Sequence, residues 1–169
     1  MKRLQGKKVV LREKYIADAQ KDYVWATDRE LMRLDAAEPY PMDYSVYMIE
    51  YPHGLADTGK IQFAIETMEG EHIGNCTCYN IDMHAQEAEL GIMIGDRSYW
   101  GKGYGSDAVK TLIRYILREL GLRRISLHTL TWNVRAQECF ERCGFTHCGC
   151  VIKQGREFVK MEALFYDEG

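Results

Sequence analysis

The stretch that decides the fold is Tyr99–Ile116, "YWGKGYGSDAVKTLIRYI". It places Gly101, Gly103 and Gly105 directly before a segment whose apolar residues recur every three to four positions, which predicts a helix from about Ser106. Glycine costs backbone entropy, so three alternating glycines indicate unusual dihedral angles or a close approach to the main chain. An anion bound by backbone amides at the amino terminus of this helix would account for them.

Two common phosphate-binding loops do not match this stretch. A Walker A loop requires G-x-x-x-x-G-K-[ST], but Lys102 is followed by Gly103, and Gly95 lies one residue too far upstream. A Rossmann fingerprint requires G-x-G-x-x-G and an acidic residue at the end of the next strand, whereas this loop reads G-x-G-x-G and the next strand ends at Asn133. Two interpretations remain: a nest of amides that holds a pyrophosphate, with Ser106 as the helix N-cap, and a tight turn without a ligand.

Hydrophobic periodicity along the chain predicts the order β-α-α-β-β-β-α-β-α-β-β. The strand segments are 6–15, 61–68, 73–83, 87–95, 123–132, 148–153 and 158–166, and the main helical segments are 16–28, 29–37, 106–120 and 133–145. Segment 42–55 is a further candidate helix, which we expect to end at Pro52 and Gly54. A strand, a helix and a strand in the middle of the chain imply at least one parallel pair within a mostly antiparallel sheet.

Length, composition and charge limit the classes of protein that the chain can represent. It has 169 residues, which favours a single domain over residues 1–169. Its net charge of −3 disfavours a general nucleic-acid binder. The amino terminus lacks the apolar core of a signal peptide, and no stretch approaches the roughly 20 apolar residues that cross a bilayer. We therefore expect a cytoplasmic protein that binds neither nucleic acid nor a membrane.

Cysteine and histidine give no indication of a metal site. The six cysteines are spaced C-x-C and then C-x3-C-x4-C-x-C, which matches no common zinc pattern. We therefore expect reduced cysteines that act as small hydrophobic side chains, and no metal. The five histidines form no constellation with serine or cysteine, so we expect structural or surface roles for them.

Charged residues are unevenly distributed along the chain. Nine acidic residues stand against three basic ones between Ile16 and Thr58, and seven basic residues stand against two acidic ones between Arg97 and Arg124. Such runs usually form solvated faces. The alternative is a cationic substrate near the first segment and an anionic ligand near the second.

The segments "AELGIMIG", "YWGKGYGSDAV" and "NVRAQECFERCGF" together resemble the GNAT superfamily of acetyl-CoA-dependent N-acetyltransferases. The chain is similar to the branch that contains ribosomal-protein N-terminal acetyltransferases and spermidine N-acetyltransferases. The similarity covers nearly the whole chain and is most specific between Ala88 and Phe145. It implies an α/β (α+β) GNAT fold, in which a mixed, mostly antiparallel sheet of about seven strands has a splayed central parallel pair and about four flanking helices.

For the cofactor, the resemblance implies acetyl-CoA as co-substrate. The glycine loop would bind the pyrophosphate, and the preceding strand would offer its backbone to the pantetheine arm. An asparagine and the helix that follows it would lie beside the cofactor. The residues implied are Ile92, Met93, Ile94, Trp100, Gly101, Lys102, Gly103, Tyr104, Gly105, Ser106, Asn133, Ala136 and Cys139. Most of the superfamily begins the loop with Gln or Arg, whereas this branch also uses the tryptophan found here.

For catalysis, the resemblance implies direct attack of a neutral primary amine on the thioester in a ternary complex, without a covalent acyl-enzyme. Glu89 is the candidate general base, although a solvent-facing strand glutamate would look the same. The backbone amide of Met93 is the candidate for stabilising the oxyanion. Many members carry a tyrosine that returns a proton to the leaving thiolate, but here that position is Phe140. A non-catalytic CoA-binding module is therefore the alternative function.

The acceptor is open between a protein N-terminal α-amine and a small amine such as a polyamine. The tripeptide "EPY" at Glu38–Tyr40 occurs in a similar position in spermidine acetyltransferases and lies in the acidic front segment. The tyrosines of this segment would either line an acceptor pocket or pack as one face of a helix; they are Tyr40, Tyr44, Tyr47 and Tyr51. The resemblance is also compatible with a homodimer.

Overall fold

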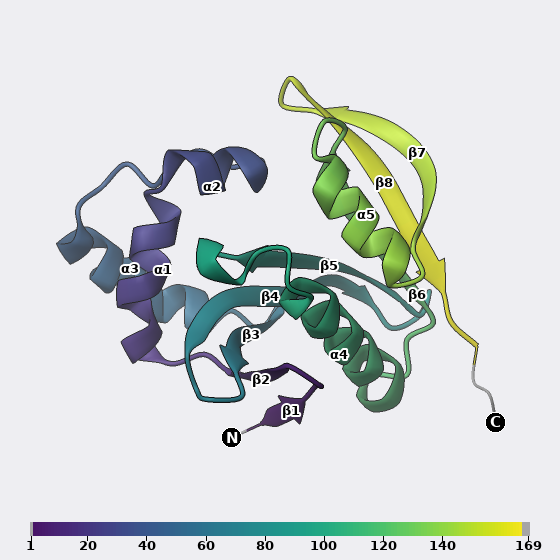
Figure 1. Ribbon diagram of the computed structural model, residues 1–169, viewed down its shortest axis with the longest axis horizontal. Helices are drawn as coiled ribbons and strands as arrows, with labels where there is room; N and C mark the ends of the chain where they lie inside the picture. The colour runs from purple at the N-terminus through teal and green to yellow at the C-terminus, as the bar shows by residue number, and fades with distance from the viewer. Residues whose placement is uncertain (1, 167–169) are drawn as a thin grey trace.

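The computed structural model describes residues 2–166, and these form one mixed sheet of eight strands (Figure 1). The strands lie in the spatial order β1-β2-β3-β4-β5-β6-β8-β7. β5 and β6 are parallel and all other neighbouring pairs are antiparallel, which confirms the predicted fold class. The strands are β1 (Arg3–Gln5), β2 (Val9–Glu13), β3 (Ile61–Thr67), β4 (His72–Asp82), β5 (Glu87–Ile94), β6 (Arg124–Leu130), β7 (Thr146–Lys153) and β8 (Arg156–Leu164).

Five α-helices and two short 3-10 helices accompany the sheet within residues 2–166. α1 contacts both α2 and α3, and these three helices gather at one end of the molecule (Figure 1). α4 lies against β1, β2, β4 and β5 and also contacts α5. The helices are η1 (Ile16–Asp18), α1 (Ala19–Ala26), α2 (Arg29–Leu34), α3 (Tyr44–Leu55), η2 (Arg97–Tyr99), α4 (Tyr104–Glu119) and α5 (Val134–Arg142).

α4 packs into the main core because its apolar residues recur at helical spacing. Ala108, Leu112 and Ile116 are completely buried and belong to the same cluster as the apolar residues of the sheet. This burial, rather than helix propensity alone, stabilises the helix. Gly121 follows at φ = +67°, the left-handed conformation typical of a residue just after a helix.

β5 and β6 separate soon after they meet. Their ladder consists of only three pairs, Glu87↔Arg124, Ala88↔Ile125 and Glu89↔Ser126. Beyond these pairs β5 stays paired with β4 as far as Ile94, and β6 stays paired with β8 as far as Leu130. The facing edges of the two strands therefore carry backbone groups that have no partner in the opposite strand, as expected for a splayed pair.

The structure differs from the sequence-based expectations at three places. The strand predicted over 6–15 is shorter, because β2 covers only Val9–Glu13 and residues 6–8 form the turn before it. β1 lies outside that segment and is an eighth strand that the sequence analysis does not predict, because its three residues are too few to show a periodicity. α3 does not end at Pro52 and Gly54 but runs on to Leu55, because a proline in the last turn removes only one helical hydrogen bond. α4 begins at Tyr104 with Gly103 as its N-cap, so Ser106 lies inside the helix and does not cap it.

Candidate active site

The glycine loop has a backbone conformation that requires glycine. Gly101 and Gly103 have φ values of +69° and +86°, in the left-handed region that other residues rarely adopt. Gly103 is also the N-cap of α4. The first amides of a helix have no partner within it, and they stand at the positive end of the helix dipole. The main chain of residues 103–106 can therefore hold an anion.

A turn almost 100 residues away in the sequence supports this loop. The carboxylate of Asp107 accepts hydrogen bonds from the amides of residues 7–9, at 3.1, 2.7 and 3.0 Å. The Lys8 ammonium donates to the carbonyl oxygen of Lys102 at 2.6 Å. Its Nζ lies 3.7 Å from the position that a Cβ on Gly103 would take. The Asp107 charge is thus directed at the β1–β2 turn, and Lys8 brings a cation to the loop.

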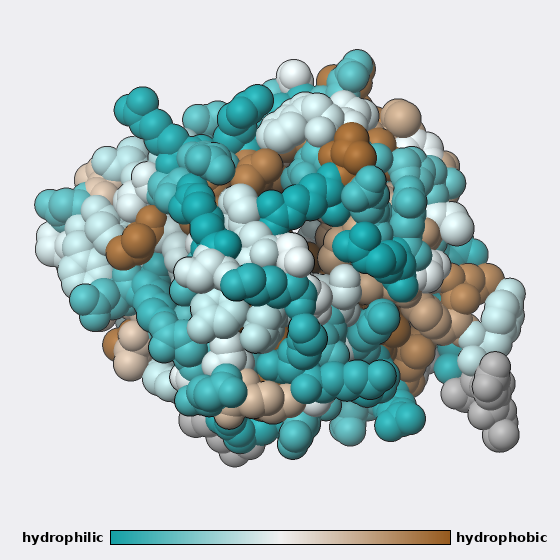
Figure 2. All heavy atoms as spheres, viewed as in Figure 1, coloured by the Kyte–Doolittle hydropathy of each residue, from teal (hydrophilic) through white to brown (hydrophobic). Residues whose placement is uncertain are grey.

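A cavity of about 710 Å³ opens between this loop, β5, α2 and α5, and we call it the coenzyme cavity after the residues that the sequence analysis expects to bind the cofactor. Eleven of the thirteen residues expected to bind the cofactor line it: Ile92, Met93, Ile94, Trp100, Gly101, Gly103, Gly105, Ser106, Asn133, Ala136 and Cys139. Lys102 and Tyr104 do not line it; Lys102 is exposed, and the Tyr104 ring packs edge-on against Tyr99. In Figure 2 the mostly hydrophilic surface is hollowed between the regions that α2 and α5 occupy in Figure 1.

Trp100 fixes the turn that leads from β5 into the loop. Its indole Nε1 donates to the carbonyl oxygen of Ile94 at 2.8 Å. The guanidinium carbons of Arg135 and Arg97 lie 4.4 and 5.5 Å from a ring centroid of the indole. The ring also packs against the small buried cluster that joins α1 to α2. Trp100 therefore ties β5, α2 and α5 together around the cavity.

Asn133 is the N-cap of α5 as well as a lining residue of the coenzyme cavity. Its side-chain oxygen accepts a hydrogen bond from the amide of Ala136 at 3.3 Å. Gln137 Nε2 donates to the carbonyl oxygens of Leu130 and Thr131, at 3.1 and 3.0 Å, and so holds the turn after β6. Capping alone accounts for an asparagine at this position, so its contact with a cofactor stays a prediction.

Cys139 places a sulfur atom beside the glycine loop. Its Sγ lies 3.3 Å from the Oγ of Ser106. A hydrogen bond from the Cys143 thiol and a second from Ser106 lower the pKa of Cys139, although burial opposes them. The positive charges of Arg142 and Arg135 act in the same direction as these hydrogen bonds. The cavity therefore contains a thiol that ionises more readily than a free cysteine.

Several lining residues of the coenzyme cavity are not anticipated by the sequence analysis. From α5 these are Arg135 and Arg142, which stand seven residues apart and so lie on one face of the helix. That spacing, in a helix already expected beside the cofactor, is a signal that could have identified them. Leu31 and Leu34 of α2 carry no comparable signal, because their contact depends on how α2 packs across the cavity.

Glu89 lies where β5 and β6 begin to separate. Its neighbours Ala88 and Leu90 are each 2% exposed, so alternation along the strand places Glu89 on the opposite face of the sheet. Its Oε1 accepts a hydrogen bond from Asn80 at 3.1 Å, and its Oε2 lies 3.3 Å from His128 Nδ1. The side chains of Glu89 and His128 are 21% and 15% exposed. The carboxylate is therefore held by two partners and still reached by water.

Tyr79 faces Glu89 across the β4–β5 pair. Burial, and then the Glu89 carboxylate, raise the pKa of Tyr79 to about 12, so its hydroxyl stays protonated at neutral pH. Glu89 itself does not line the coenzyme cavity. The sequence analysis does not anticipate Tyr79 or Asn80, and it expects only a structural or surface role for His128. These contacts join three strands and have no local signature in the sequence.

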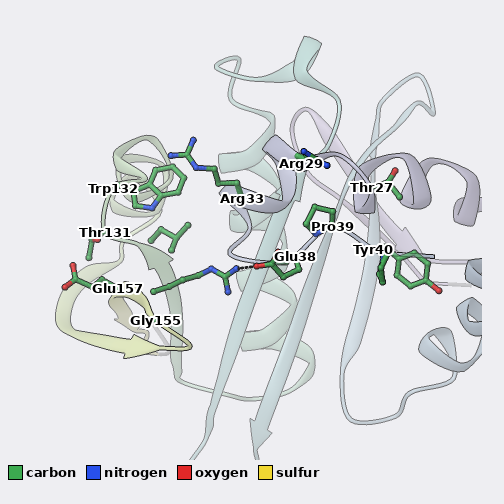
Figure 3. A pocket seen from close by; sticks show the side chains of 14 residues that line it. Thr27, Arg29, Arg33, Glu38, Pro39, Tyr40, Thr131, Trp132, Gly155 and Glu157 are labelled. Atoms are coloured by element: carbon green, nitrogen blue, oxygen red, sulfur yellow. Dashed lines mark hydrogen bonds and ion pairs between the residues drawn. The ribbon is translucent and has the colours of Figure 1, made fainter. Parts of the chain in front are cut away.

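A second cavity, of about 970 Å³, lies between α2 with its following loop and the β7–β8 hairpin, and we call it the arginine cavity (Figure 3). Two contacts cross it. Arg156, at the start of β8, donates to Glu38 Oε1 at 2.6 Å. The guanidinium carbon of Arg33 lies 4.6 Å from a ring centroid of Trp132, and Figure 3 shows these two side chains meeting. Arg29 also lines this cavity.

Of the four tyrosines of the front segment, Tyr40 alone lines either of these two cavities. Its hydroxyl donates to Glu50 at 2.6 Å. The rings of Tyr40, Tyr44, Tyr47 and Tyr51 pack in one cluster with Tyr23, with centroids 5.0 to 6.4 Å apart between neighbours. Three of the four tyrosines therefore have a packing role, and Tyr40 combines packing with a place in the arginine cavity.

The acidic residues of the front segment mostly have partners of their own. Eight of the nine form an ion pair or accept a side-chain or backbone hydrogen bond: Asp18, Asp22, Asp28, Glu30, Glu38, Asp43, Glu50 and Asp57. The ninth, Asp35, lines the coenzyme cavity. The excess of acids in this segment therefore does not by itself create a site for a cationic substrate.

Within residues 2–166 no helix has the length and apolar character needed to cross a membrane. The same residues contain no group of three or more His, Cys, Asp or Glu side chains that could hold a metal ion. The six cysteines are unbridged. Cys76 and Cys78 are buried on one face of β4, and burial raises the pKa of Cys78 to about 11, so this thiol stays protonated at neutral pH.

Comparison with known proteins agrees with this geometry. The family described as Acetyltransferase (GNAT) domain matches residues 8–146. An uncharacterized N-acetyltransferase, p20 of Bacillus licheniformis, is 32% identical over 128 residues, which are 74% of this chain and 71% of that protein. A putative ribosomal N-acetyltransferase, YdaF of Bacillus subtilis, is 31% identical over 99 residues, which are 59% of this chain and 51% of that protein. A crystal structure of spermidine N-acetyltransferase from Vibrio cholerae in complex with CoA and spermine has a TM-score of 0.83 at 23% identity, with 92% of this chain and 95% of that chain covered.

Proposed function

Because this chain belongs to the GNAT family of acetyltransferases, we propose that it acetylates a primary amine, either a protein N-terminal α-amine or a small amine such as a polyamine. The family's co-substrate is acetyl-CoA, and the chain is an acyltransferase. Two similar proteins support the two kinds of acceptor. One is a putative ribosomal N-acetyltransferase, and the other is a spermidine N-acetyltransferase solved with CoA and spermine.

We propose that acetyl-CoA, which supplies the reactive thioester, binds in the coenzyme cavity. The amides around Gly103 and the ammonium of Lys8 would hold the pyrophosphate. A Cβ on Gly105 would point toward Ile94 and Cys139, so the bare glycine leaves room for a group against the helix start. The unpaired edge of β5 offers peptide groups to the two amides of pantetheine. The observation that carries the proposal is that the loop, this edge and α5 border one cavity.

Glu89 is the proposed general base. An ammonium has no lone pair, so the acceptor must lose a proton before it attacks the thioester. The Glu89 carboxylate would accept that proton through a water molecule, which its partial exposure allows. The hydrogen bond from Asn80 and the contact with His128 keep the carboxylate in one orientation.

Release of free thiol from acetyl-CoA, followed for a panel of amines and peptides, tests this proposal. Glu89→Gln should lower kcat by about 10²- to 10⁴-fold, the usual contribution of a general base, without preventing coenzyme binding. Glu87→Gln is the matched control, because Glu87 is exposed on the same strand and its kcat should stay within about twofold. Equal rates for the two variants would remove Glu89 from the mechanism.

A CoA-binding module without catalysis is the second candidate, and Phe140 is the observation in its favour. The Phe140 ring is buried, packs against Phe145 with centroids 6.0 Å apart, and has no hydroxyl to protonate a leaving thiolate. Tight CoA binding without thiol release for any amine would establish the module. A protein whose melting temperature does not respond to CoA would exclude both candidates.

A further inference from the structure

We infer that the arginine cavity binds acceptors that carry a carboxylate in addition to the reactive amine, an inference that rests on the proposed acetyl transfer. The two cavities lie on either side of α2 and of the turn after β6. Leu31 and Leu34 of α2 line the coenzyme cavity, whereas Arg29 and Arg33 of the same helix line the arginine cavity. The turn after β6 likewise contributes Trp132 to the arginine cavity and the next residue to the coenzyme cavity. A small molecule bound in the arginine cavity is therefore close to the coenzyme cavity, on the other side of α2 and of this turn.

Guanidinium groups outnumber carboxylates in the lining of this cavity. It is lined by three arginines and by only two acidic side chains, Glu38 and Glu157. Arg33 contacts the Trp132 ring, and neither it nor Arg29 forms an ion pair with any residue in 2–166. The acids nearby on α2 and before it, Asp28 and Glu30, are already paired with Arg97 outside the cavity. The cavity therefore has donors that lack an acidic partner.

The chemistry of these donors selects the ligand. A guanidinium presents a planar fork of N–H donors that matches the two oxygens of a carboxylate. A polyamine would instead bring more positive charge beside Arg29 and Arg33, which have no acidic partner among the described residues, and this is unfavourable at close range. Trp132, which is 46% exposed, offers apolar surface for the carbon skeleton of a ligand. Amino acids and other amines with a carboxylate supply two oxygens to a guanidinium, carry less positive charge than a polyamine, and have a carbon skeleton that can pack on this surface.

Glu38 occupies the place that such a carboxylate would take. Its Oε1 accepts from Arg156 Nη2 at 2.6 Å, yet its side chain is 85% exposed, whereas that of Arg156 is 29% exposed. An exposed ion pair contributes little to stability, so an incoming carboxylate can replace Glu38 at low cost. In this account Glu38 competes with the acceptor for Arg156.

Matched acceptors that differ only in the carboxylate test the inference. We propose to measure kcat/KM for L-lysine against cadaverine and for L-phenylalanine against phenethylamine, with spermidine and O-phosphoethanolamine as further acceptors. The carboxylated member of each pair should be favoured at least about tenfold, the effect of one charge-assisted hydrogen bond. Arg33→Gln and Arg156→Gln should each reduce this ratio toward one. Glu38→Gln should lower KM for the carboxylated amines, because the competing carboxylate is gone.

Arg118→Gln is the control, because Arg118 is exposed on α4 and lines neither cavity. It should keep the wild-type ratio, and melting temperatures should show that all variants fold. Equal or higher kcat/KM for the decarboxylated amines or for spermidine would overturn the inference while leaving acetyl transfer intact. A preference for O-phosphoethanolamine over every carboxylated amine would overturn it as well. Coenzyme binding without acetylation of any amine would instead remove the proposed function.

Discussion

Replacing Gly105 with alanine should strengthen the fold and weaken coenzyme binding at the same time. Gly105 is the second residue of α4, and a Cβ there would lie 3.7 Å from Ile94 Cγ1 and 4.0 Å from Cys139 Sγ. These are ordinary contact distances, so no neighbour has to move. Alanine is favoured over glycine in helices by up to about 1 kcal/mol, and we expect roughly 0.5 kcal/mol of added stability in this first turn.

The same methyl group would stand in the coenzyme cavity against the amides that we propose hold the pyrophosphate. Loss of one hydrogen bond to a charged group costs about 1.5–3 kcal/mol, which corresponds to a rise in the Kd for CoA of about 10- to 100-fold. Calorimetric titration with CoA and urea unfolding measure the two effects separately. Gly54→Ala is the control: Gly54 is in α3, has nothing within 4 Å of its Cβ position, and should leave the Kd unchanged. An unchanged Kd for Gly105→Ala would refute the placement of the coenzyme.

Two further predictions concern titratable groups. Because its pKa is lowered, Cys139 should react with iodoacetamide at pH 7 faster than the exposed Cys148, and bound CoA should slow this reaction. Peptide mass spectrometry with and without CoA measures the labelling of both cysteines. Labelling of Cys139 that is no faster than that of Cys148, or that CoA leaves unchanged, would contradict the prediction. Although burial opposes the shift, hydrogen bonds from Arg12 and the Tyr15 amide hold the pKa of Asp18 below its unfolded value. The Asp18 carboxylate therefore contributes to stability above about pH 4, and this contribution is lost as the pH falls. Asp18→Asn should therefore cost about 3 kcal/mol at pH 7 and clearly less at pH 3 in urea unfolding, and an equal cost at both pH values would contradict this assignment.

Local patterns in the sequence predict the centre of the fold well. The helical spacing after Gly105 and the alternating glycines before it are properties of a few consecutive residues. The structure has α4 there, preceded by two glycines at positive φ. The parallel β5–β6 pair also follows from element order, because a helix between two strands requires a crossover. The boundaries are less predictable: β1 has only three residues, and α3 continues through Pro52.

Contacts between distant residues account for what the sequence does not predict. Lys8 reaches the glycine loop and Asp107 holds the β1–β2 turn across about 100 positions, and neither contact has a local signature. The acidic front segment is the clearest example. Its excess of acids leaves a cationic ligand as the alternative to a solvated face, but side-chain pairing occupies most of these acids. The basic lining of the arginine cavity is assembled from α2 and the start of β8.

The central claim is that the backbone of the glycine loop and the start of α4 hold the pyrophosphate of the coenzyme. A crystal structure of the protein with CoA measures this directly. We predict phosphate oxygens at hydrogen-bonding distances, about 2.7–3.2 Å, from the amide nitrogens of residues 103–106, with Lys8 close by. A well-ordered diphosphate bound away from these amides would contradict the account.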